Sequence, residues 1–212
     1  MTTPSSREVQ RDRLLEAALL HVPFDGWSRR SLLAAARDTG IEPGLARRLF
    51  PRGGDDLLAH LDRWADRRML ERIDPEAVQA MRVRERIAAL VRARLDVLGP
   101  HREAMRRATA ARMLPGNAFT ACQNLWRSAD LIWATAGDQA EDYSYYTKRS
   151  LLAGVWTSTF FFWLDDQSEN FEATSAFLER RIENVMQIGT IRGRFDEAMK
   201  GVWRLNPFAV RP

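Results

Sequence analysis

The side chains best suited to chemistry are few in this 212-residue chain, and they are widely separated. The three histidines, His21, His60 and His101, stand far apart, and none belongs to the Glu-x-x-His pair that places two metal ligands on one helical face. The sequence has no Gly-x-Ser-x-Gly elbow, no glycine-rich phosphate loop and no Cys-x-x-Cys pair. It therefore predicts a protein without catalytic activity, metal or cofactor.

Two further kinds of reactive group are better explained by structure than by chemistry. Cys122 is the single cysteine of the chain, so it has no thiol to pair with, and we expect it to be a small buried apolar residue. Paired carboxylates occur at two predicted helix ends, where we expect solvated side chains: Asp55 with Asp56, and Asp165 with Asp166. Sites assembled from distant residues stay possible, because local motifs do not exclude them.

The composition is that of an ordinary globular protein, with 45% hydrophobic and 28% charged residues. The polar start, MTTPSSREVQRDR, has no apolar core of a secretory or transit signal, so we expect a cytosolic protein. The net charge of +4 is uneven: residues 76–135 carry 10 basic and 5 acidic groups, residues 136–190 carry 4 and 9, and residues 191–212 carry 5 and 2. This alternation indicates separate surfaces for different partners.

Helical periodicity runs through the chain, and no useful length alternates with the period of a strand. Ser5 and Glu8 fit a capping box before the first helix, which the PFDGW stretch is expected to end, while Ser28 and Gly40 cap the second. Further helices are predicted from Pro43 to Phe50, from near Asp55 past Met69, from Pro75 to Leu98, from Arg102 to Met113, from Phe119 to Ala134, from Tyr143 to Leu164 and from Ser168 to Ile188.

The first three helices have the lengths and breaks of a helix-turn-helix module. The stretch RLLEAALLHVPFDGWSRRSLLAAARDTGIEPGLARRLFPRGGDDLLAHL resembles the N-terminal domain of TetR-type transcriptional regulators, whose third helix enters the major groove. Here that helix would present Glu42, Arg47 and Arg48. Residues 1–75 carry 13 basic and 12 acidic groups, a poor electrostatic match to a duplex, so we expect a scaffold with no DNA partner.

Three segments carry a second resemblance: HVPFDGW (residues 21–27), AGDQAEDYSYYTKRSLLAG (136–154) and FLERRIENVM (177–186). Together they look like the accessory lipid-binding protein family of ubiquinone (coenzyme Q) biosynthesis, which has a TetR-like fold but is not a transcription factor. The resemblance covers about residues 12–190. It implies a homodimer that binds isoprenoid quinone intermediates or other lipids and presents them to the di-iron demethoxyubiquinone hydroxylase. Such a protein would be peripheral on the inner membrane of a bacterium, in the cytoplasm.

The uncharged run from Ser150 to Leu164 predicts a buried helix, because its roughly 14 apolar or small residues fall short of the about 20 needed to cross a bilayer. One helical face carries Tyr145, Arg149, Leu152, Trp156, Phe160 and Trp163, and we expect it to face the interior. On the other face, the small residues Gly154 and Ser158 would allow close approach at a dimer interface. The candidate lipid-binding residues are Met105, Met113, Trp126, Trp156 and Phe160; a filled core is the alternative.

The turn before that helix gathers aromatic and acidic residues. Asp142 is placed to cap the helix, and Tyr145 and Tyr146 project from its first turn. If the two flanking helices form a hairpin, Ile132 and Trp133 lie near those tyrosines, as in the aromatic anchors of protein interfaces. The resemblance implies that the hydroxylase docks here, with Tyr145 where family members commonly carry tryptophan. A purely structural role for these residues is the alternative.

The C-terminal segment from Ile188 to Leu205 places its apolar residues in an arc of roughly 160°, which predicts an amphipathic helix. Its glycines make it a weak helix in water, so we expect it to order on an anionic membrane. The expected membrane-binding residues are Ile191, Phe195, Met199, Val202 and Trp203. The alternative is docking of this stripe on its own subunit or on a dimer partner.

These features predict an all-α, TetR-like helical bundle in three parts. Residues 1–72 form a helix-turn-helix-like module, residues 73–190 a helical lipid-binding and dimerisation domain, and residues 191–212 an amphipathic, membrane-associating tail. The predicted function is that of a lipid-binding accessory protein of ubiquinone biosynthesis. The alternative is a TetR-type DNA-binding regulator that has a lipid as its ligand.

Overall fold

The computed structural model describes residues 5–138 and 143–187, and within these ranges helices are the only regular elements. The prediction of an all-α protein is confirmed. The helices are α1 (Ser6–Asp25), α2 (Arg29–Thr39), α3 (Pro43–Leu49), α4 (Gly54–Arg72), α5 (Pro75–Ala80), α6 (Val83–Leu98), α7 (Arg102–Arg112), α8 (Pro115–Thr135), α9 (Tyr143–Asp165) and a last helix over 172–187, with short 3-10 turns η1 (Gly99–His101) and η2 (Glu169–Phe171).

The N-terminal helices begin and end largely where their caps predict. The Ser5 hydroxyl accepts from the Glu8 amide, and Ser28 does the same at the start of α2. Gly40 ends α2 in the left-handed conformation that glycine adopts without a Cβ penalty. The expected break at the PFDGW stretch is confirmed, because α1 includes Pro23 but ends at Asp25. There the Gly26 amide donates to the Val22 carbonyl and closes the last turn.

Two predicted helices have different bounds in the structure. The helix expected from Pro75 to Leu98 is divided, because Met81 and Arg82 adopt extended backbone and the Arg82 amide donates to the Glu85 carboxylate at the start of α6. Helix α8 begins at Pro115, one turn before the predicted start, in the first-turn position where proline loses no hydrogen bond.

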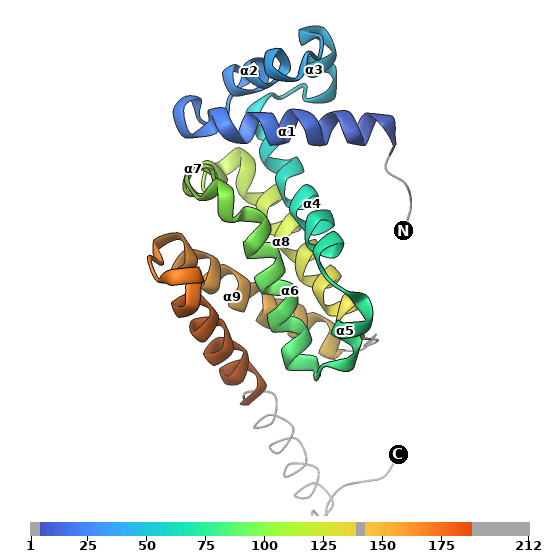
Figure 1. Ribbon diagram of the computed structural model, residues 1–212, viewed down its shortest axis with the longest axis vertical. Coiled ribbons are helices and arrows are strands. Elements are labelled where there is room, and N and C mark those ends of the chain that lie inside the picture. Colours follow the sequence, from blue (N-terminus) through green and yellow to red (C-terminus); the bar gives the residue numbers. More distant parts are fainter. Residues whose placement is uncertain (1–4, 139–142, 188–212) are drawn as a thin grey trace, which may run out of the picture.

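The arrangement of the helices is a cap on a bundle (Figure 1). Helices α1, α2 and α3 lie together at one end, and α4 leads from them into a bundle with α6 and α8. Helix α9 packs against α8, and the 172–187 helix lies at the edge of the molecule away from the cap. The cap is fixed to the bundle because α1 lies across α7 and because the Trp27 indole donates to the Ala104 carbonyl.

One hydrophobic core runs from the cap through the bundle, so the first three helices do not form a separate core. At the joint between cap and bundle, α4 approaches Trp27 so closely that a Cβ on Gly54 would lie 2.0 Å from the Trp27 carbonyl oxygen. Only glycine fits this position. The close joint holds α4 rigidly to the cap while its C-terminal half enters the bundle.

Helix α9 packs by the face that its sequence predicts. Arg149, Leu152, Trp156, Phe160 and Trp163 are all buried, whereas Gly154 is exposed and a Cβ there would meet no atom within 4 Å. The dimer contact expected of Gly154 and Ser158 stays a prediction.

The turn after α9 corrects one expectation. Asp165 is exposed as predicted, but Asp166 is 6% exposed and accepts hydrogen bonds from the amides of Ser168 and Thr174 and from the Thr174 hydroxyl. Its carboxylate is buried because it satisfies the backbone amides between α9 and the 172–187 helix.

Within the described ranges, no helix combines the length and hydropathy that a membrane crossing requires. The predicted membrane-binding residues of the tail lie outside the described residues: Ile191, Phe195, Met199, Val202 and Trp203.

Candidate functional site

A cavity of about 260 Å³ opens between α7, α8 and α9. Its walls are mainly apolar and include three of the predicted lipid-binding residues, Met113, Trp156 and Phe160. The rings of Trp156 and Phe160 lie 5.7 Å apart between centroids and form one wall. The other lining residues are Asp62, Arg94, Thr109, Arg112, Ala118, Ala121, Cys122, Leu125, Ser128, Thr157 and Phe161.

The other two predicted lipid-binding residues lie elsewhere. Met105 is 1% exposed and belongs to the filled core. Trp126 projects from α8 toward Tyr146, with 6.1 Å between the ring centroids, and is not among the residues that line the cavity. The structure thus separates the five candidates into a cavity wall, a core position and a surface aromatic group.

The inner end of the cavity is built from buried charges that the sequence analysis did not identify. The Arg94 guanidinium lies between two carboxylates of α4, donating to Asp66 at 2.8 Å and to Asp62 at 3.3 Å. Its face lies over the Trp156 ring, 4.3 Å from the centroid. Ser128 of α8 donates to Asp66 at 2.8 Å. Helices α4, α6, α8 and α9 therefore meet at one buried polar group.

These groups keep one another charged inside the protein. Burial by itself raises the pKa of Asp62, but the nearby Arg112 and Arg94 charges, with hydrogen bonds from Arg94 and Asn124, hold this pKa below its usual value. Burial likewise opposes the charge on Arg94, but Asp66 and Asp62 raise the pKa of the guanidinium. The inner end of the cavity is therefore ionic although water is largely excluded from it.

The mouth of the cavity is apolar and exposed. Met113 is 72% exposed and Phe161 is 43% exposed, and both line the opening. Cys122 lines it too and is exposed, so the expectation that Cys122 is buried was wrong. The cysteine lies on the outward face of α8, next to the cavity rather than beneath it. The mouth of the cavity is therefore apolar and exposed to solvent, whereas its inner end is ionic and buried.

Only a weak signal in the sequence could have revealed this floor. Asp62 and Asp66 are one helical turn apart on the same face of α4 as the buried Leu58 and Met69. A pair of carboxylates on an apolar stripe is unusual and predicts a buried cationic partner. The sequence does not say which of 30 arginines supplies that partner, because Arg94 comes from another helix.

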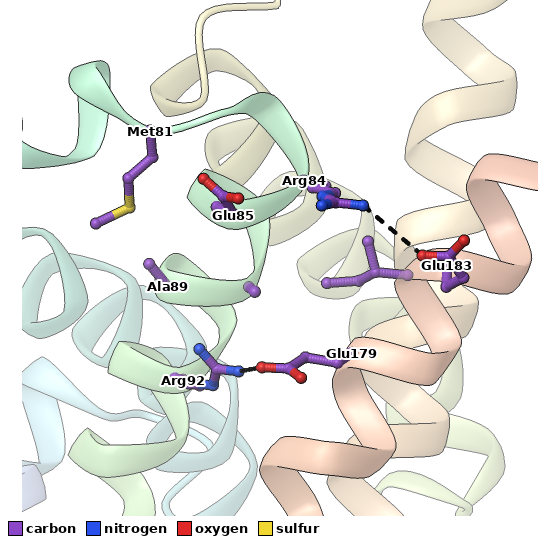
Figure 2. A pocket seen from close by; sticks show the side chains of 9 residues that line it. Met81, Arg84, Glu85, Ala89, Arg92, Glu179 and Glu183 are labelled. Atoms are coloured by element: carbon purple, nitrogen blue, oxygen red, sulfur yellow. Dashed lines mark hydrogen bonds and ion pairs between the residues drawn. The ribbon is translucent and has the colours of Figure 1, made fainter.

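A larger hollow, of about 610 Å³, lies between α6 and the 172–187 helix (Figure 2). In Figure 2, Arg84 and Arg92 of α6 point across to Glu183 and Glu179 of the last helix. The Arg84 to Glu183 separation is 3.8 Å, and Arg92 hydrogen-bonds to Glu179. The charged side chains of this groove are thus paired across it and exposed to water.

The predicted docking residues divide between surface and core. Tyr146 is 61% exposed, with the Tyr145 and Trp126 rings beside it at 5.2 and 6.1 Å between centroids. Ile132 and Trp133 are buried at 1% and 8% exposed, inside the core where a partner cannot reach them. Asp142 lies outside the described residues.

Tyr145 is held in place by charged neighbours. Its hydroxyl donates to Asp130 at 3.0 Å, and the Arg149 guanidinium carbon lies 3.3 Å from its ring centroid. Arg149 also donates to Asp130 at 2.6 Å and to Asp138 at 3.2 Å. The ring is fixed from below by these contacts, which leaves Tyr146 as the outermost aromatic side chain of this group.

His60, and Glu42 at the start of the third helix of the cap, are held by local hydrogen bonds. His60 bonds to Asp12 at 2.7 Å, and burial lowers the pKa of its imidazole despite that carboxylate. Glu42 accepts from the amides of Gly44 and Leu45, which lowers its pKa and makes it the N-cap of α3. Across the described residues, no group of three or more potential metal ligands comes together.

Comparison with known proteins places the fold among TetR-type proteins. A solved structure, the TetR transcriptional regulator from Nitrosomonas europaea, matches 84% of this chain and 99% of its own with a TM-score of 0.69. At 24% sequence identity this likeness defines the class of fold alone.

The sequence comparisons point to COQ9 proteins. The COQ9 family model matches residues 118–189. Ubiquinone biosynthesis protein COQ9 from Homo sapiens is 31% identical over 191 residues, or 87% of this chain, and COQ9-B from Xenopus laevis is 33% identical over the same share. The Schizosaccharomyces pombe protein is 28% identical over 93% of this chain and 77% of its own. The chain is therefore similar in sequence to COQ9 proteins over most of its length.

The relation covers only part of those relatives. The chain spans 60% of the length of the human protein and 65% of the Xenopus laevis one. All three relatives carry the description mitochondrial and the name ubiquinone biosynthesis protein.

Proposed function

We propose that this protein is a non-catalytic, lipid-binding accessory protein of ubiquinone biosynthesis. It holds isoprenoid quinone intermediates and presents them to the hydroxylase that acts on demethoxyubiquinone. The observation that carries lipid binding is the cavity between α7, α8 and α9, whose apolar walls and exposed apolar mouth suit a lipid chain. The names of the COQ9 relatives support the pathway.

The floor of the cavity favours binding over catalysis. Asp62 and Arg94 hold each other ionised, so neither is poised to exchange a proton near neutral pH. Aromatic and methionine walls offer contact area without fixed hydrogen-bond demands, which suits a flexible isoprenoid chain. The chemistry then belongs to the partner enzyme, and this protein supplies the substrate.

Presentation to a hydroxylase requires a docking surface, and the exposed aromatic group of α8 and α9 supports one. Tyr146 and its neighbour Trp126 lie on the surface next to acidic Asp130, a combination that suits a protein interface. Ile132 and Trp133 stiffen this surface from inside the core. The partner therefore meets a surface that is already ordered, which reduces the entropic cost of binding.

In a bacterial cell the protein acts in the cytoplasm at the inner membrane, as a peripheral homodimer. The pattern of the tail supports the membrane contact, with Phe195 and Trp203 among its apolar residues and a basic majority of charges. Two small residues of α9, the exposed Gly154 and the half-buried Ser158, support close approach of a second subunit.

Lipid extraction tests the binding proposal. The protein is purified without detergent, and organic extracts of it are examined by mass spectrometry beside those of two variants. Ala121→Phe places a ring in the cavity, and Ala134→Phe places the same ring on the exposed face of α8. We expect isoprenoid quinones or their precursors to copurify with the wild-type protein and with Ala134→Phe, and to be lost from Ala121→Phe. Equal amounts of copurified lipid in all three proteins would show that the lipid does not bind in this cavity.

Docking is tested by a pull-down with the purified hydroxylase. Tyr146→Ala removes the outermost ring of the surface, and Phe24→Ala removes an exposed ring near the end of α1 as a control. We expect only Tyr146→Ala to weaken capture, by tenfold or more if Tyr146 is a hot spot. Unchanged capture by Tyr146→Ala would contradict docking through this surface.

The regulator alternative rests on one observation, the exposure of Arg47 and Arg48 on α3. A repressor would bind DNA through them with a steep dependence on salt. Suppose that the purified protein contains no lipid and binds a DNA duplex tightly at low salt. If Arg47→Ala and Arg48→Ala then abolish this binding, the regulator function would take the place of the accessory function.

A further inference from the structure

Arg112 is the charged residue of the cavity whose hydrogen-bond donors are only partly used within the protein. Its Nη2 donates to Asp62 at 2.8 Å, and its side chain is 23% exposed. A guanidinium has five N–H donors, and Asp62 is the one acceptor recorded for Arg112 within residues 5–138 and 143–187. Arg94, by contrast, has three acceptors and is 2% exposed. Arg112 is therefore the more exposed of the two guanidiniums and has more donors left to offer to a bound molecule.

The cavity is polar at its closed end and apolar at its open end. The side chains of Arg94 and Asp62 at the floor are 3% and 12% exposed. Met113 at the mouth is 72% exposed, and the residue after it, Leu114, is 59% exposed. A ligand that matches this gradient carries a polar head that enters and an apolar chain that follows it.

We propose that Arg112 recognises the oxygen-bearing head of the lipid, so that the ligand binds head inward with its chain leaving between Met113 and Phe161. This rests on the proposed lipid-binding function and names the chemistry of the head. The head carries a hydrogen-bond acceptor, which is either a quinone or phenol oxygen on a prenylated ring or the phosphate of a phospholipid. A guanidinium binds both kinds of oxygen, and a ring oxygen also places its ring beside Trp156.

The reverse orientation is unfavourable because of the same donors. An apolar chain pushed to the floor would strip water from Arg112 without giving it an acceptor, and an unsatisfied buried donor is costly. The volume of about 260 Å³ lies below the roughly 300–1,000 Å³ of pockets that enclose a drug-sized molecule, so only part of a lipid fits inside. The cavity therefore takes a head and the start of a chain, while the rest of the chain lies over the exposed α7 to α8 turn.

The test compares three probes that differ in their heads, each binding to the full chain. They are a benzoquinone with a two-unit prenyl chain, the oxygen-free benzene with the same chain, and a short-chain phosphatidylglycerol. Affinities are measured for the wild type, Arg112→Gln, Arg112→Lys and Arg107→Gln. Arg107 is the matched control, because it lies on α7, outside the cavity, in a 3.8 Å ion pair with Glu103. Unfolding midpoints confirm that each variant is folded.

We expect Arg112→Gln to weaken at least one oxygen-bearing probe tenfold or more, which corresponds to about 1.4 kcal/mol, and to leave the oxygen-free probe within about twofold. Arg112→Lys should show part of the same loss of affinity, because lysine keeps the charge but lacks the forked donors. Arg107→Gln should match the wild type. The oxygen-bearing probe that loses most identifies ring or phosphate as the head.

Two results would overturn the assignment. Equal weakening of all three probes by Arg112→Gln would mean that Arg112 only shapes the cavity. Equal binding of the three probes by the wild type would mean that the head is not recognised, although lipid binding itself would stand. If the wild type binds none of the probes, the proposed lipid-binding function fails as well, so the two failures are distinguishable.

Discussion

The cavity between α7, α8 and α9 and the groove between α6 and the 172–187 helix both contain arginines paired with carboxylates, but the pairs face different environments. In the groove, Arg84 and Glu183 are each about half exposed, so water screens their attraction. At the floor of the cavity, Arg94 and Asp66 have side chains 3% and 6% exposed, so water screens their attraction far less.

The comparison of the two hollows shows that the larger volume is not the better-formed binding site. The groove is the larger hollow, yet five of its nine lining residues are charged, and two arginines among them pair with glutamates across it. The cavity is less than half its volume and combines apolar walls with buried charges, an arrangement that costs desolvation energy and gains polar specificity in return. Predictions about these two hollows follow, from the largest expected effect to the smallest.

Arg94→Met should have the largest effect on stability. It removes the cation between Asp62 and Asp66 and leaves two buried carboxylates with less compensation, so we expect a loss of about 3–5 kcal/mol. Urea unfolding measures it. Adding Asp66→Leu should restore part of the loss, because one of the uncompensated charges is then gone. A loss below about 1 kcal/mol would show that water reaches the charges at the floor of the cavity more than their burial indicates.

Ser128→Ala should have an intermediate effect. The hydroxyl donates to the Asp66 carboxylate at 2.8 Å, and a hydrogen bond to a charged group contributes about 1.5–3 kcal/mol. Ser158→Ala is the control, since Ser158 bonds to carbonyls of its own helix and is only half-buried. Equal unfolding midpoints for the two variants would contradict a special role for the cavity floor.

Asp166→Asn should change the pH dependence of stability more than stability itself. Burial opposes ionisation of Asp166, but the Ser168 and Thr174 donors lower its pKa from 3.8 to about 2. Because the folded-state pKa is depressed, its stabilisation is present above pH 4 and is lost as the pH falls toward 2.

Asparagine has one acceptor oxygen where the carboxylate uses two, so at pH 7 we expect a cost of about 1 kcal/mol. Between pH 4 and pH 2 the variant should lose less stability than the wild type in thermal unfolding. An unchanged acid profile would mean that Asp166 does not control the joint between α9 and the 172–187 helix. Since these elements line the cavity and the groove respectively, this residue joins the two regions.

Glu183→Gln in the groove should have the smallest effect. The pair with Arg84 is long at 3.8 Å and exposed, so we expect a change of less than about 0.5 kcal/mol in the free energy of unfolding, and less still at high salt. A loss comparable to that of Arg94→Met would abolish the distinction between the two hollows.

The fold was largely predictable from the sequence because its signals are local. Ser5, Ser28 and Gly40 cap helices within a few residues of themselves, and Trp156 and Phe160 repeat at the period of one helix. Boundaries that depended on weaker signals were missed, as at Met81, where extended backbone divides a predicted helix.

The site was predictable only in part. Met113, Trp156 and Phe160 line the cavity as expected, but Met105 lies in the filled core although it is just as apolar. A sequence tells that such a side chain avoids water, not whether neighbours from other helices have filled the space beside it.

By itself, the sequence determined the helices, the TetR-like order of their lengths and breaks, and the likeness to COQ9 proteins. The tertiary structure alone decided that Asp62 and Asp66 of α4 meet Arg94 of α6 and Arg112 of α7 at the floor of an apolar cavity. The physical reason is that capping and periodicity act over a few residues, whereas a buried charge is stabilised by whichever opposite charge the packing of distant helices places beside it.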